Sequence, residues 1–326
     1  MTEVGNCVLV LGRIADAGLE RLSSVGFRSV PLPDHSSERF AAVREADAII
    51  VRMTPIDEEL LKAAPRLRIV SRHGVGYDTV DLAALTRRGI PLTVTGDVNS
   101  GAVAEHTMAL ILALAKRITE YDSATRTGNF AIRDSFSALE LAGRTILLLG
   151  YGRIGRKVAV LAAAFGMRVL VYDPFVEPAQ ITAQGYTVES DLHSALGKAD
   201  FVTVHLPKTP ETTHLIDAAA LAAMRSDAFI VNVARGGLID EQALFKALKE
   251  GGIAGAALDV FEVEPPSESN PIFTCRNVVL SPHSAAFTRE CADRMAVASA
   301  ENVIAFFRGN LDRRLVINPE TLSDNL

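Results

Sequence analysis

Three side chains that can bind an anion or exchange a proton each follow an apolar run in the second half of the sequence. They are Arg235 in VNVARGG, Glu264 in LDVFEVEPP and His283 in VVLSPHSAA. Arginine offers a planar fork of donors to a carboxylate or phosphate, and histidine exchanges protons near neutral pH. If the apolar runs are parallel strands of one open sheet, their carboxyl ends share the edge beyond which ligands bind. The pattern therefore predicts a site where the three side chains converge.

Each of these residues also has a plainer explanation when it is taken alone. Arg235 fits a salt-bridged corner of the fold, Glu264 before two prolines fits a solvated turn, and His283 fits a structural histidine. Gly236 and Gly237 follow the arginine and permit either a sharp turn or the close approach of a ligand, which a Cβ would obstruct. An arginine at the end of an apolar strand thus indicates either a salt bridge or a ligand.

A second group of residues has the spacing of a dinucleotide site. Gly150, Gly152 and Gly155 in LLLGYGRIGRKVA have GxGxxG spacing, between an apolar strand over 145–149 and an amphipathic helix that ends at Gly166. The three glycines would allow a tight turn, the approach of a pyrophosphate and close packing of helix on strand, and the helix N-terminus would present N–H groups to the phosphates. The alternative is a glycine-rich turn without a ligand.

The strand after this helix ends in an acidic residue, Asp173. Its carboxylate is placed to accept hydrogen bonds from the adenosine ribose hydroxyls, and it would repel a 2′-phosphate, so NAD is predicted over NADP. The residues of the fingerprint assigned to NAD are Gly150, Tyr151, Gly152, Arg153, Ile154, Gly155 and Asp173.

The elements that must position these residues alternate between strand and helix along the whole chain. The candidate strands are short and apolar on both faces, which is typical of parallel sheets covered by helices on both sides. They are CVLVLG, AIIVR, LRIVSR, PLTVT, TILLLG, RVLVYD, FVTVHL, AFIVNVA, GAALDVF and NVVLS. One mononucleotide-type sheet needs fewer strands, so the sequence predicts an α/β fold with two doubly wound parallel sheets.

The chain of 326 residues also exceeds the usual size of a single core. The division is expected near Asn99, before an apolar helix over 102–117, and a second helix over 288–307 should return to the first domain. We therefore expect a discontinuous, flavodoxin-like substrate domain of residues 1–99 plus 288–326. A Rossmann NAD-binding domain would occupy residues 100–287, with a cleft between the two.

Composition excludes several classes of function. With 48% hydrophobic and 22% charged residues the chain is an ordinary soluble globular protein, and a net charge of −6 argues against nucleic acid or an anionic membrane as partner. The start MTEVGNCVLVLG lacks an export signal, and MALILALAK is too short to span a bilayer. Cys7, Cys275 and Cys291 have no CxxC spacing, so reduced thiols in a cytoplasmic protein are expected, and no metal site.

Over nearly its whole length the chain resembles the D-isomer-specific 2-hydroxyacid dehydrogenases. The stretches that look like the signature blocks of this family, in its order, are RHGVGYDTVD, NSGAVAEHTMALILAL, LLLGYGRIGRKVA, VHLPKTPETTHLI, VNVARGGLIDEQAL, ALDVFEVEPP and LSPHSAAFT. The resemblance implies an NAD-dependent oxidoreductase that interconverts a 2-keto acid and a D-2-hydroxy acid. Because the sequence ends at Leu326, the expectation is a member without a C-terminal regulatory domain.

The resemblance also implies that Arg235, Glu264 and His283 are the catalytic residues. The reaction moves a hydride between the nicotinamide and C2 of the substrate and a proton to or from the carbonyl oxygen. His283 would be the proton donor, and Glu264 would bond its other ring nitrogen and stabilise the imidazolium. Arg235 would bind the substrate carboxylate and polarise the carbonyl.

Further site residues are carried over from the family. The backbone of Gly74, Val75 and Gly76 would bind the substrate carboxylate, although a plain tight turn is the alternative. Arg52 would meet a second anionic group of the substrate, with a surface ion pair as the alternative. Asp259 would bind the nicotinamide carboxamide, and the residues expected to line the cofactor site are His205, Leu206, Pro207, Thr212, Val233, Ala234, His283 and Ala285. The histidines left as structural or surface residues are His35, His73, His106, His193 and His214.

The substrate is left open among several 2-keto acids. The pair 3-phosphoglycerate and 3-phosphohydroxypyruvate is the first candidate, with Arg52 as a cation for the phosphate, and Arg126 or Arg133 as cations from a partner subunit. Glyoxylate or hydroxypyruvate reduction and a bulkier 2-keto acid are alternatives. A non-enzymatic, NAD-sensing, corepressor-like protein is the alternative from another class, because a fold does not fix a function. The helix from Ala102 and the arm over 118–136 match the dimer element of the family, so a homodimer is expected.

Overall fold

A computed structural model describes residues 5–322 of the chain. It divides into two compact units: unit 1 combines Met1–Asn99 with Phe287–Leu326, and unit 2 is Ser100–Ala286. The second boundary thus precedes Phe287, one residue earlier than the one expected from the sequence. The two units are described separately.

Unit 1 is built on a five-stranded parallel sheet in the order β2-β1-β3-β4-β5. This is the doubly wound order of flavodoxin-like folds. Its strands are β1 (Cys7–Leu11), β2 (Arg28–Leu32), β3 (Ala48–Val51), β4 (Ile69–Arg72) and β5 (Leu92–Thr93). β1 reads CVLVL and is buried over its whole length, as expected for a central strand that helices cover on both faces.

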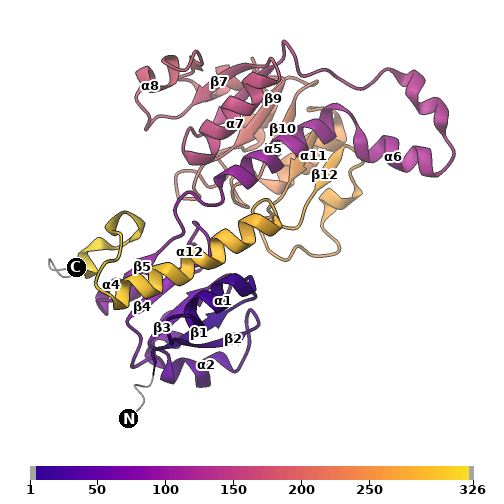
Figure 1. The fold of residues 1–326 in the computed structure, drawn as a ribbon. Helices are drawn as coiled ribbons and strands as arrows, with labels where there is room; N and C mark the ends of the chain where they lie inside the picture. Colours follow the sequence, from indigo (N-terminus) through magenta and orange to yellow (C-terminus); the bar gives the residue numbers. More distant parts are fainter. Residues whose placement is uncertain (1–4, 323–326) are drawn as a thin grey trace. The chain divides into compact units, whose positions relative to one another are not determined.

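The helices of unit 1 form two hydrophobic layers around this sheet (Figure 1). They are α1 (Asp16–Ser23), α2 (Arg39–Ala42), α3 (Glu58–Lys62), α4 (Leu82–Arg87) and α12 (Arg289–Phe307), with short 3-10 turns η1 (Val43–Glu45), η4 (Arg313–Leu315) and η5 (Pro319–Thr321). α12 packs on α1 and β4, and Ser71 of β4 donates a hydrogen bond to the carbonyl of Ser299 at 2.9 Å. The C-terminal helix therefore returns to the sheet of the N-terminal segment.

Unit 2 is built on a seven-stranded parallel sheet in the order β12-β11-β10-β9-β6-β7-β8. The order reverses between β6 and β9, as in dinucleotide-binding folds, where the ligand lies at that reversal. The strands are β6 (Thr145–Leu149), β7 (Arg168–Tyr172), β8 (Thr187–Val188), β9 (Phe201–Val204), β10 (Phe229–Asn232), β11 (Gly255–Leu258) and β12 (Val278–Leu280). The prediction of two doubly wound parallel sheets is confirmed.

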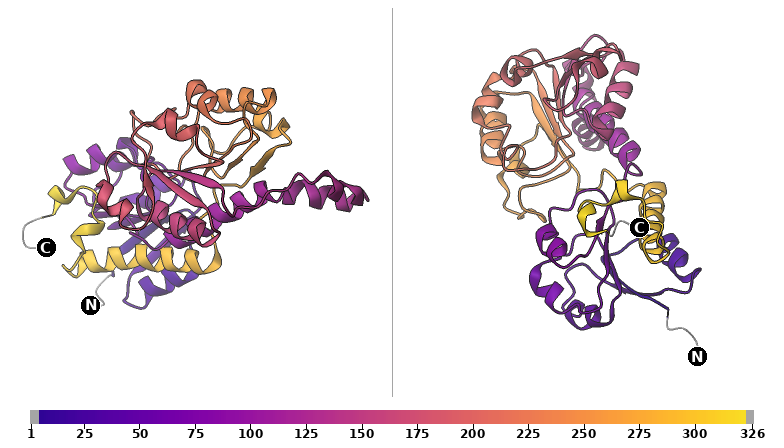
Figure 2. Two further views of the ribbon diagram at one scale, coloured as in Figure 1. Left: turned by 90° about the horizontal axis from the view of Figure 1, so that it is seen from above. Right: turned by 90° about the vertical axis from the view of Figure 1, so that its left-hand side faces the viewer.

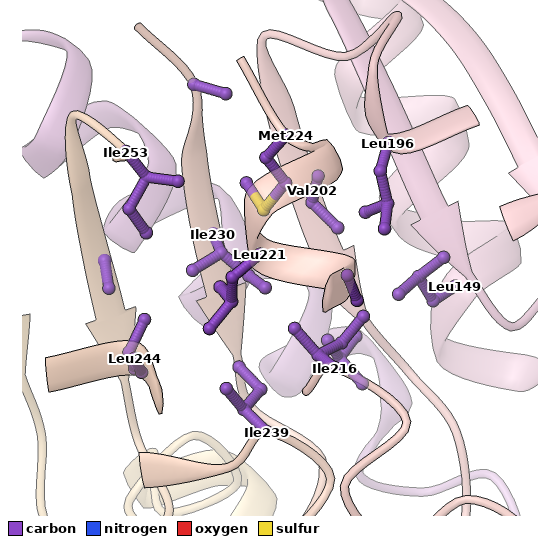
Figure 3. Packing of buried hydrophobic residues seen from close by; sticks show 14 of the residues in the cluster. Leu149, Leu196, Val202, Ile216, Leu221, Met224, Ile230, Ile239, Leu244 and Ile253 are labelled. Atoms are coloured by element: carbon purple, nitrogen blue, oxygen red, sulfur yellow. The ribbon is translucent and has the colours of Figure 1, made fainter. Parts of the chain in front are cut away.

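Helices cover both faces of this second sheet (Figures 1 and 2). The covering helices are α5 (Ser100–Ala115), α7 (Arg153–Ala164), α8 (Pro178–Thr182), α9 (Leu192–Leu196), α10 (Ala218–Ala223) and α11 (Glu241–Glu250), with the 3-10 turn η3 (Pro271–Thr274). α6 (Ile118–Arg126) and the 3-10 turn η2 (Phe130–Ser135) form an arm that extends away from the sheet. Figure 3 shows one of the two layers, in which Val202 and Ile230 of neighbouring strands meet Leu221 and Leu244 of α10 and α11. The other layer is formed by α5 and α7 against the opposite face.

Two strands were not expected from the sequence. β2 reads RSVPL, and its proline argues against a strand when the sequence is read alone. The strand tolerates Pro31 because it lies at an edge of its sheet, where the missing N–H needs no partner. β8 has only two residues, too few to show a period. α5 begins and ends two residues before the expected helix, and Arg117, with a φ of 52°, starts the separate helix α6. Within residues 5–322, the structure contains no helix whose length and hydropathy would let it cross a bilayer.

Candidate active site

The residues predicted to do chemistry gather at the carboxyl edge of three neighbouring strands of unit 2. Arg235 follows β10, Glu264 follows β11 and His283 follows β12, and these strands are consecutive in the sheet. The parallel order therefore brings together side chains that are separated by tens of residues in the sequence. All three belong to unit 2, so their arrangement is a property of that unit alone.

His283 and Glu264 are in direct contact. The imidazole Nδ1 lies 2.6 Å from Oε2 of the carboxylate. The second carboxylate oxygen, Oε1, accepts a hydrogen bond from the backbone N–H of Phe261 at 3.0 Å. Because the contact with Glu264 uses Nδ1, proton exchange with a ligand falls to Nε2. The His283 side chain is 38% exposed, so solvent or a ligand has access to the ring.

The surroundings of Glu264 keep its carboxyl group ionised. Burial by itself would raise its pKa, but hydrogen bonds from His283 and from the Phe261 N–H, together with the charges of His283 and Arg235, outweigh burial and lower the pKa below its ordinary value. At neutral pH the carboxylate therefore carries its negative charge beside the imidazole. This is the arrangement that stabilises a protonated histidine during proton transfer.

Arg235 belongs to a tight corner held by the side chain of Asn232. Asn232, the last residue of β10, donates from Nδ2 to the carbonyl of Arg235 at 2.8 Å and accepts from the N–H of Ala234 at 3.0 Å. The guanidinium Nη1 in turn donates to the Ala234 carbonyl at 2.7 Å. The asparagine thus fixes the position from which the arginine side chain departs.

The two glycines after Arg235 allow the loops that follow β10 and β11 to pack closely. A Cβ at Gly236 would lie 1.7 Å from the carbonyl oxygen of Phe261, so this corner packs directly on the backbone of the loop that carries Glu264. Gly237 has a φ of 79°, a conformation that side chains disfavour. The sequence left open whether a ligand or the protein lies close to these glycines. At Gly236 the close neighbour is the loop that carries Glu264.

The loop that carries His283 is organised by Asp259. The carboxylate accepts hydrogen bonds from the Ser281 hydroxyl at 2.5 Å, the Ser284 N–H at 2.9 Å and the Ala285 N–H at 2.9 Å. The N–H of His283 also donates to the backbone carbonyl of Asp259 at 2.7 Å. The side chain of Asp259 has no exposed surface in this structure, so its contact with a nicotinamide carboxamide stays a prediction.

The glycine fingerprint forms the turn that its spacing predicts. A Cβ at Gly150 would lie 2.7 Å from the carbonyl oxygen of His205, and one at Gly155 would lie 2.2 Å from the carbonyl oxygen of Gly150. A Cβ at Gly152, in contrast, would meet nothing within 4 Å. Gly152 is also the N-cap of α7, so its open side adjoins the N–H groups at that helix start. A pyrophosphate therefore fits at this turn.

Asp173 presents its side chain at the glycine turn, whereas Tyr151 buries its side chain. Asp173, after β7, accepts hydrogen bonds from the N–H groups of Tyr151 at 2.8 Å and Phe175 at 2.9 Å, which places its carboxylate next to the turn. The Tyr151 side chain is buried in an edge-to-face contact with Tyr186. Only the backbone of Tyr151 is therefore suited to contact a cofactor.

The residues after β9 lie behind the glycine turn. The carbonyl of His205 and the Leu206 side chain are the closest neighbours of the Cβ position at Gly150, and the Thr212 hydroxyl closes the following loop by donating to the Pro207 carbonyl at 2.8 Å. Burial lowers the pKa of His205 to about 3, so its ring is neutral at neutral pH.

The remaining expected wall residues lie in both layers of the unit 2 core. Val233 and Ala285 share the layer that α5 and α7 form, whereas Ala234 packs against the opposite one.

The unit 1 residues predicted to bind substrate lie at the carboxyl edge of its own sheet. Arg52 follows β3, and its guanidinium lies over the ring of Phe287, 4.4 Å from the centroid. The turn at 74–76 follows β4, and Arg72 supports it from below by donating from Nε to the carbonyl of Gly76 at 2.6 Å and from Nη1 to the carbonyl of His73 at 2.8 Å. Gly74 has a φ of 135°, which this turn requires. Reasoning from the sequence missed the supporting role of Arg72.

An apolar hollow lies beside the histidine–glutamate pair. A cavity of about 470 Å³ is bordered by Glu264 and His283. Its apolar walls are Phe261, Pro265, Pro266, Phe273, Leu280 and Pro282. The hollow therefore places an apolar surface next to the histidine–glutamate pair.

His106 and Ser281 were not among the expected site residues. His106 lies on α5 with its Nε2 2.9 Å from the Ser281 hydroxyl, which itself bonds Asp259. The only sign in the sequence is a histidine within a mostly apolar helix, AVAEHTMALILALA, and that sign is equally compatible with a surface residue.

Comparisons with known proteins agree with the architecture. The model of the D-isomer specific 2-hydroxyacid dehydrogenase, NAD binding domain, matches residues 108–285. The chain is 45% identical over 298 residues to D-3-phosphoglycerate dehydrogenase of Mycobacterium leprae, which covers 91% of this chain and 56% of that protein. It is 44% identical over 280 residues to glyoxylate reductase of Aeropyrum pernix, with 84% and 83% covered.

A solved structure extends the likeness to three dimensions. D-Lactate dehydrogenase from Aquifex aeolicus, complexed with NAD and lactic acid, superposes with a TM-score of 0.87 at 29% identity, covering 96% of this chain and 99% of that one. The chain spans only 56% and 61% of two D-3-phosphoglycerate dehydrogenases that it matches. The domain match takes in more than half of the chain, and a relative of similar length is 44% identical. The chain therefore belongs to the D-isomer specific 2-hydroxyacid dehydrogenase family, and its residues 108–285 match the NAD-binding domain of that family.

Proposed function

We propose that the protein is an NAD-dependent dehydrogenase that interconverts a 2-keto acid and a D-2-hydroxy acid. The observation that carries this proposal is the 2.6 Å contact between His283 Nδ1 and Glu264 Oε2, beside the Arg235 corner of an NAD-binding domain. A proton donor, the carboxylate that stabilises its charged form and a cation for the substrate carboxylate are the groups that this reaction needs.

The geometry supports a separate role for each of the three side chains. Arg235 binds the substrate carboxylate and orients the carbonyl, and His283 gives its Nε2 proton to the carbonyl oxygen as the alcohol forms. Glu264 accepts the Nδ1 proton in a hydrogen bond and balances the charge of the imidazolium. NADH, when bound, supplies the hydride that reaches C2. In the reverse direction neutral His283 takes the proton from the hydroxyl of the D-2-hydroxy acid.

The cofactor is held by the turn between β6 and α7. The open side of Gly152 and the start of α7 receive the pyrophosphate, and Asp173 beside the turn accepts hydrogen bonds from the adenosine ribose. A carboxylate at this place repels a 2′-phosphate, which supports NAD over NADP.

The substrate we put first is 3-phosphohydroxypyruvate, with glyoxylate and hydroxypyruvate as alternatives. D-3-Phosphoglycerate dehydrogenases and glyoxylate reductases are both among the relatives at similar identity. In unit 1 the backbone at 74–76 binds the substrate carboxylate, and Arg52, held over Phe287, meets the phosphate. The guanidinium group of an arginine can bind either a phosphate or a carboxylate through two parallel hydrogen bonds.

A kinetic test of the proposal uses His283→Ala with His193→Ala as the matched control, since His193 is exposed on α9. NADH oxidation is followed with glyoxylate, hydroxypyruvate, pyruvate and 3-phosphohydroxypyruvate. We expect His283→Ala to lower kcat by about 100-fold or more, the usual worth of general acid–base catalysis, with NADH affinity nearly unchanged. Wild-type turnover in that variant would remove His283 from the mechanism. NADH binding without turnover of any of these acids by the wild type would favour a non-enzymatic NAD sensor.

Assembly and location complete the proposal. A homodimer is supported by the arm over 118–136, which extends away from the sheet of unit 2 and exposes Ile118, Phe130 and Phe136 at 55%, 66% and 88% (Figures 1 and 2). Apolar side chains on an extended arm are typical of a buried subunit contact. Light scattering that gives the mass of a single chain would contradict it. Buried, unbridged Cys7, Cys275 and Cys291 support the reducing environment of the cytoplasm.

A further inference from the structure

A chain of hydrogen bonds connects helix α5 to the loop of His283. His106, in the first half of α5, places Nε2 2.9 Å from the hydroxyl of Ser281, the residue that follows β12. The Ser281 hydroxyl lies 2.5 Å from Oδ1 of Asp259, and the His106 Nε2 itself lies 3.6 Å from the same oxygen. α5 packs against β10, β11 and β12, so the helix is a fixed support for this chain.

The proton positions along the chain follow from its geometry. A serine hydroxyl has one proton, and a carboxylate oxygen can only accept. At 2.5 Å the Ser281 proton must point to Asp259, so the serine oxygen accepts from His106. His106 therefore carries a proton on Nε2 and acts as the donor at the head of the chain. Its side chain is 25% exposed, whereas that of Asp259 has no exposed surface.

Asp259, the last residue in this series of hydrogen bonds, fixes the backbone on both sides of His283. The Asp259 carboxylate accepts from Ser281 before the histidine and from the N–H groups of Ser284 and Ala285 after it. His283 itself has a φ of 51°, a left-handed conformation that a residue with a Cβ adopts only when its surroundings hold it there. The orientation of the Asp259 carboxylate thus determines where the His283 ring points, and with it the 2.6 Å contact to Glu264.

We propose that His106, acting through Ser281 and Asp259, is a positioning residue for His283. It touches neither substrate nor reacting atoms in this role. The buried carboxylate needs donors to remain in one orientation, because a buried charge that loses a hydrogen bond is costly and turns toward other partners. Without the His106 donor the serine hydroxyl loses its fixed direction, and the loop holds the catalytic imidazole less well. This inference rests on the proposed function, in which His283 is the proton donor.

The test compares His106→Leu, His106→Gln, Ser281→Ala and the double variant His106→Leu/Ser281→Ala. Each is assayed for NADH oxidation with the 2-keto acid of the above panel that the wild type reduces fastest, for NADH affinity by fluorescence and for Tm. His193→Leu, an exposed histidine on α9, is the matched control. Glutamine keeps a donor near the Nε2 position of histidine, whereas leucine keeps the bulk and removes the donor.

We expect His106→Leu and Ser281→Ala each to lower kcat by about 10-fold or more, because small misplacements of a catalytic group carry such costs. The KM for the keto acid and the NADH affinity should stay within about two-fold of the wild type, since the contact acts on the chemical step. His106→Gln should restore most of the lost kcat. The double variant should be no slower than the slower single variant, because both changes break one chain.

Three results would overturn the inference. They are wild-type kcat in His106→Leu, additive losses in the double variant, and a His106→Gln that loses as much kcat as His106→Leu. If His106→Leu does not fold, Ser281→Ala and His106→Gln decide the matter. If His283→Ala is inactive while Ser281→Ala and His106→Leu keep full turnover, only this inference fails. If His283→Ala matches the wild type, or the wild type reduces none of the acids, the proposed function fails first.

Discussion

The chemistry of the site depends on which atom of each side chain is already engaged. Glu264 uses one oxygen for the Phe261 N–H and the other for His283, so its orientation is fixed before a substrate arrives. The imidazole in turn is held through Nδ1, and this leaves Nε2 for the proton transfer that we propose. Preorganised contacts of this kind are effective because they need no rearrangement during the reaction.

At this scale the negative charge of Glu264 can be tested separately from its shape. Glu264→Gln keeps the size of the side chain and an oxygen acceptor but cannot balance an imidazolium. We expect kcat to fall by about 10-fold or more, because a charged acceptor makes roughly twice as strong a hydrogen bond as a neutral one and its charge favours the protonated ring. Steady-state NADH oxidation measures the effect.

The neighbouring carboxylate provides the control. Glu262 contacts His214 and the N–H of Glu241, and not His283. Glu262→Gln should therefore keep the turnover of the wild type. Equal kcat in Glu264→Gln and the wild type would show that the charge of Glu264 has no part in proton transfer.

At the scale of elements, the site is assembled by contacts between the loops that follow neighbouring strands. The loop after β10 packs on the loop after β11 at Gly236, and the loop after β12 is tied to the end of β11 by Asp259. The regular strands bring the loops to one edge, but the loops align one another. A change in one loop is therefore felt by the side chain of another.

Gly236→Ala tests this coupling between loops. The new Cβ would lie 1.7 Å from the Phe261 carbonyl, so one loop must move, and Phe261 is the residue whose N–H holds Glu264. Overpacking of this kind costs about 1–3 kcal/mol, and we expect a lower Tm together with a loss of kcat. Thermal unfolding and NADH oxidation measure the two effects.

Gly101→Ala is the matched control for that variant. Gly101 lies on α5, and a Cβ there meets nothing within 4 Å. Because alanine is the better helix former by about 1 kcal/mol, this variant should be as stable as the wild type or more stable. If Gly236→Ala behaved like Gly101→Ala, the contact between the two loops would not be tight.

At the scale of the whole molecule, each unit contains a histidine whose pKa is lowered by its surroundings, so that it is protonated less readily than usual. Burial, together with the positive charges of Arg72 and Arg52, lowers the pKa of His73 to about 4 in unit 1. Burial lowers the pKa of His205 to about 3 in unit 2. Neither ring is near its ordinary pKa, so both couple folding to protonation.

The direction of this pH dependence follows from the proton count. Well above pH 6.5 both rings are neutral in the folded and in the unfolded chain, so they do not change the free energy of unfolding. As the pH falls from about 6.5 toward 4, His73 and His205 bind protons in the unfolded chain but stay largely neutral in the folded chain, so the free energy of unfolding decreases. For His73 the loss amounts to roughly 3 kcal/mol at pH 4, from 1.36 kcal/mol per pKa unit.

Urea unfolding at several pH values between 7.5 and 4.5 measures this effect. We expect the free energy of unfolding of the wild type to decrease as the pH is lowered from 7.5 to 4.5. It should decrease less steeply in His73→Gln, whose side chain binds no proton. His193→Gln removes an exposed histidine and should leave the slope unchanged. A slope in His73→Gln equal to that of the wild type would contradict a depressed pKa at His73.

The sequence by itself determined the features that depend on local pattern. Alternation of short apolar strands with amphipathic helices predicted the two parallel sheets, because such strands must be covered on both faces. The glycine spacing predicted the turn between β6 and α7, where Gly150 and Gly155 have no room for a Cβ. The family, and with it the NAD-binding domain, was also predicted from ordered motifs. Two strands escaped, one because it contains a proline and one because it is very short.

Only the tertiary structure decided how the site residues support one another. His283 meets Glu264 across 19 positions of the sequence, and His106 meets Ser281 across 175. No local period encodes such contacts, because they arise from the order of strands in the sheet and from the conformation of each loop. For the same reason the neighbour of Gly236 proved to be the Phe261 backbone, and His106 proved to be bonded to Ser281. Residue type determines which hydrogen bonds or proton transfers a side chain can make, and the packing of the fold determines its partner.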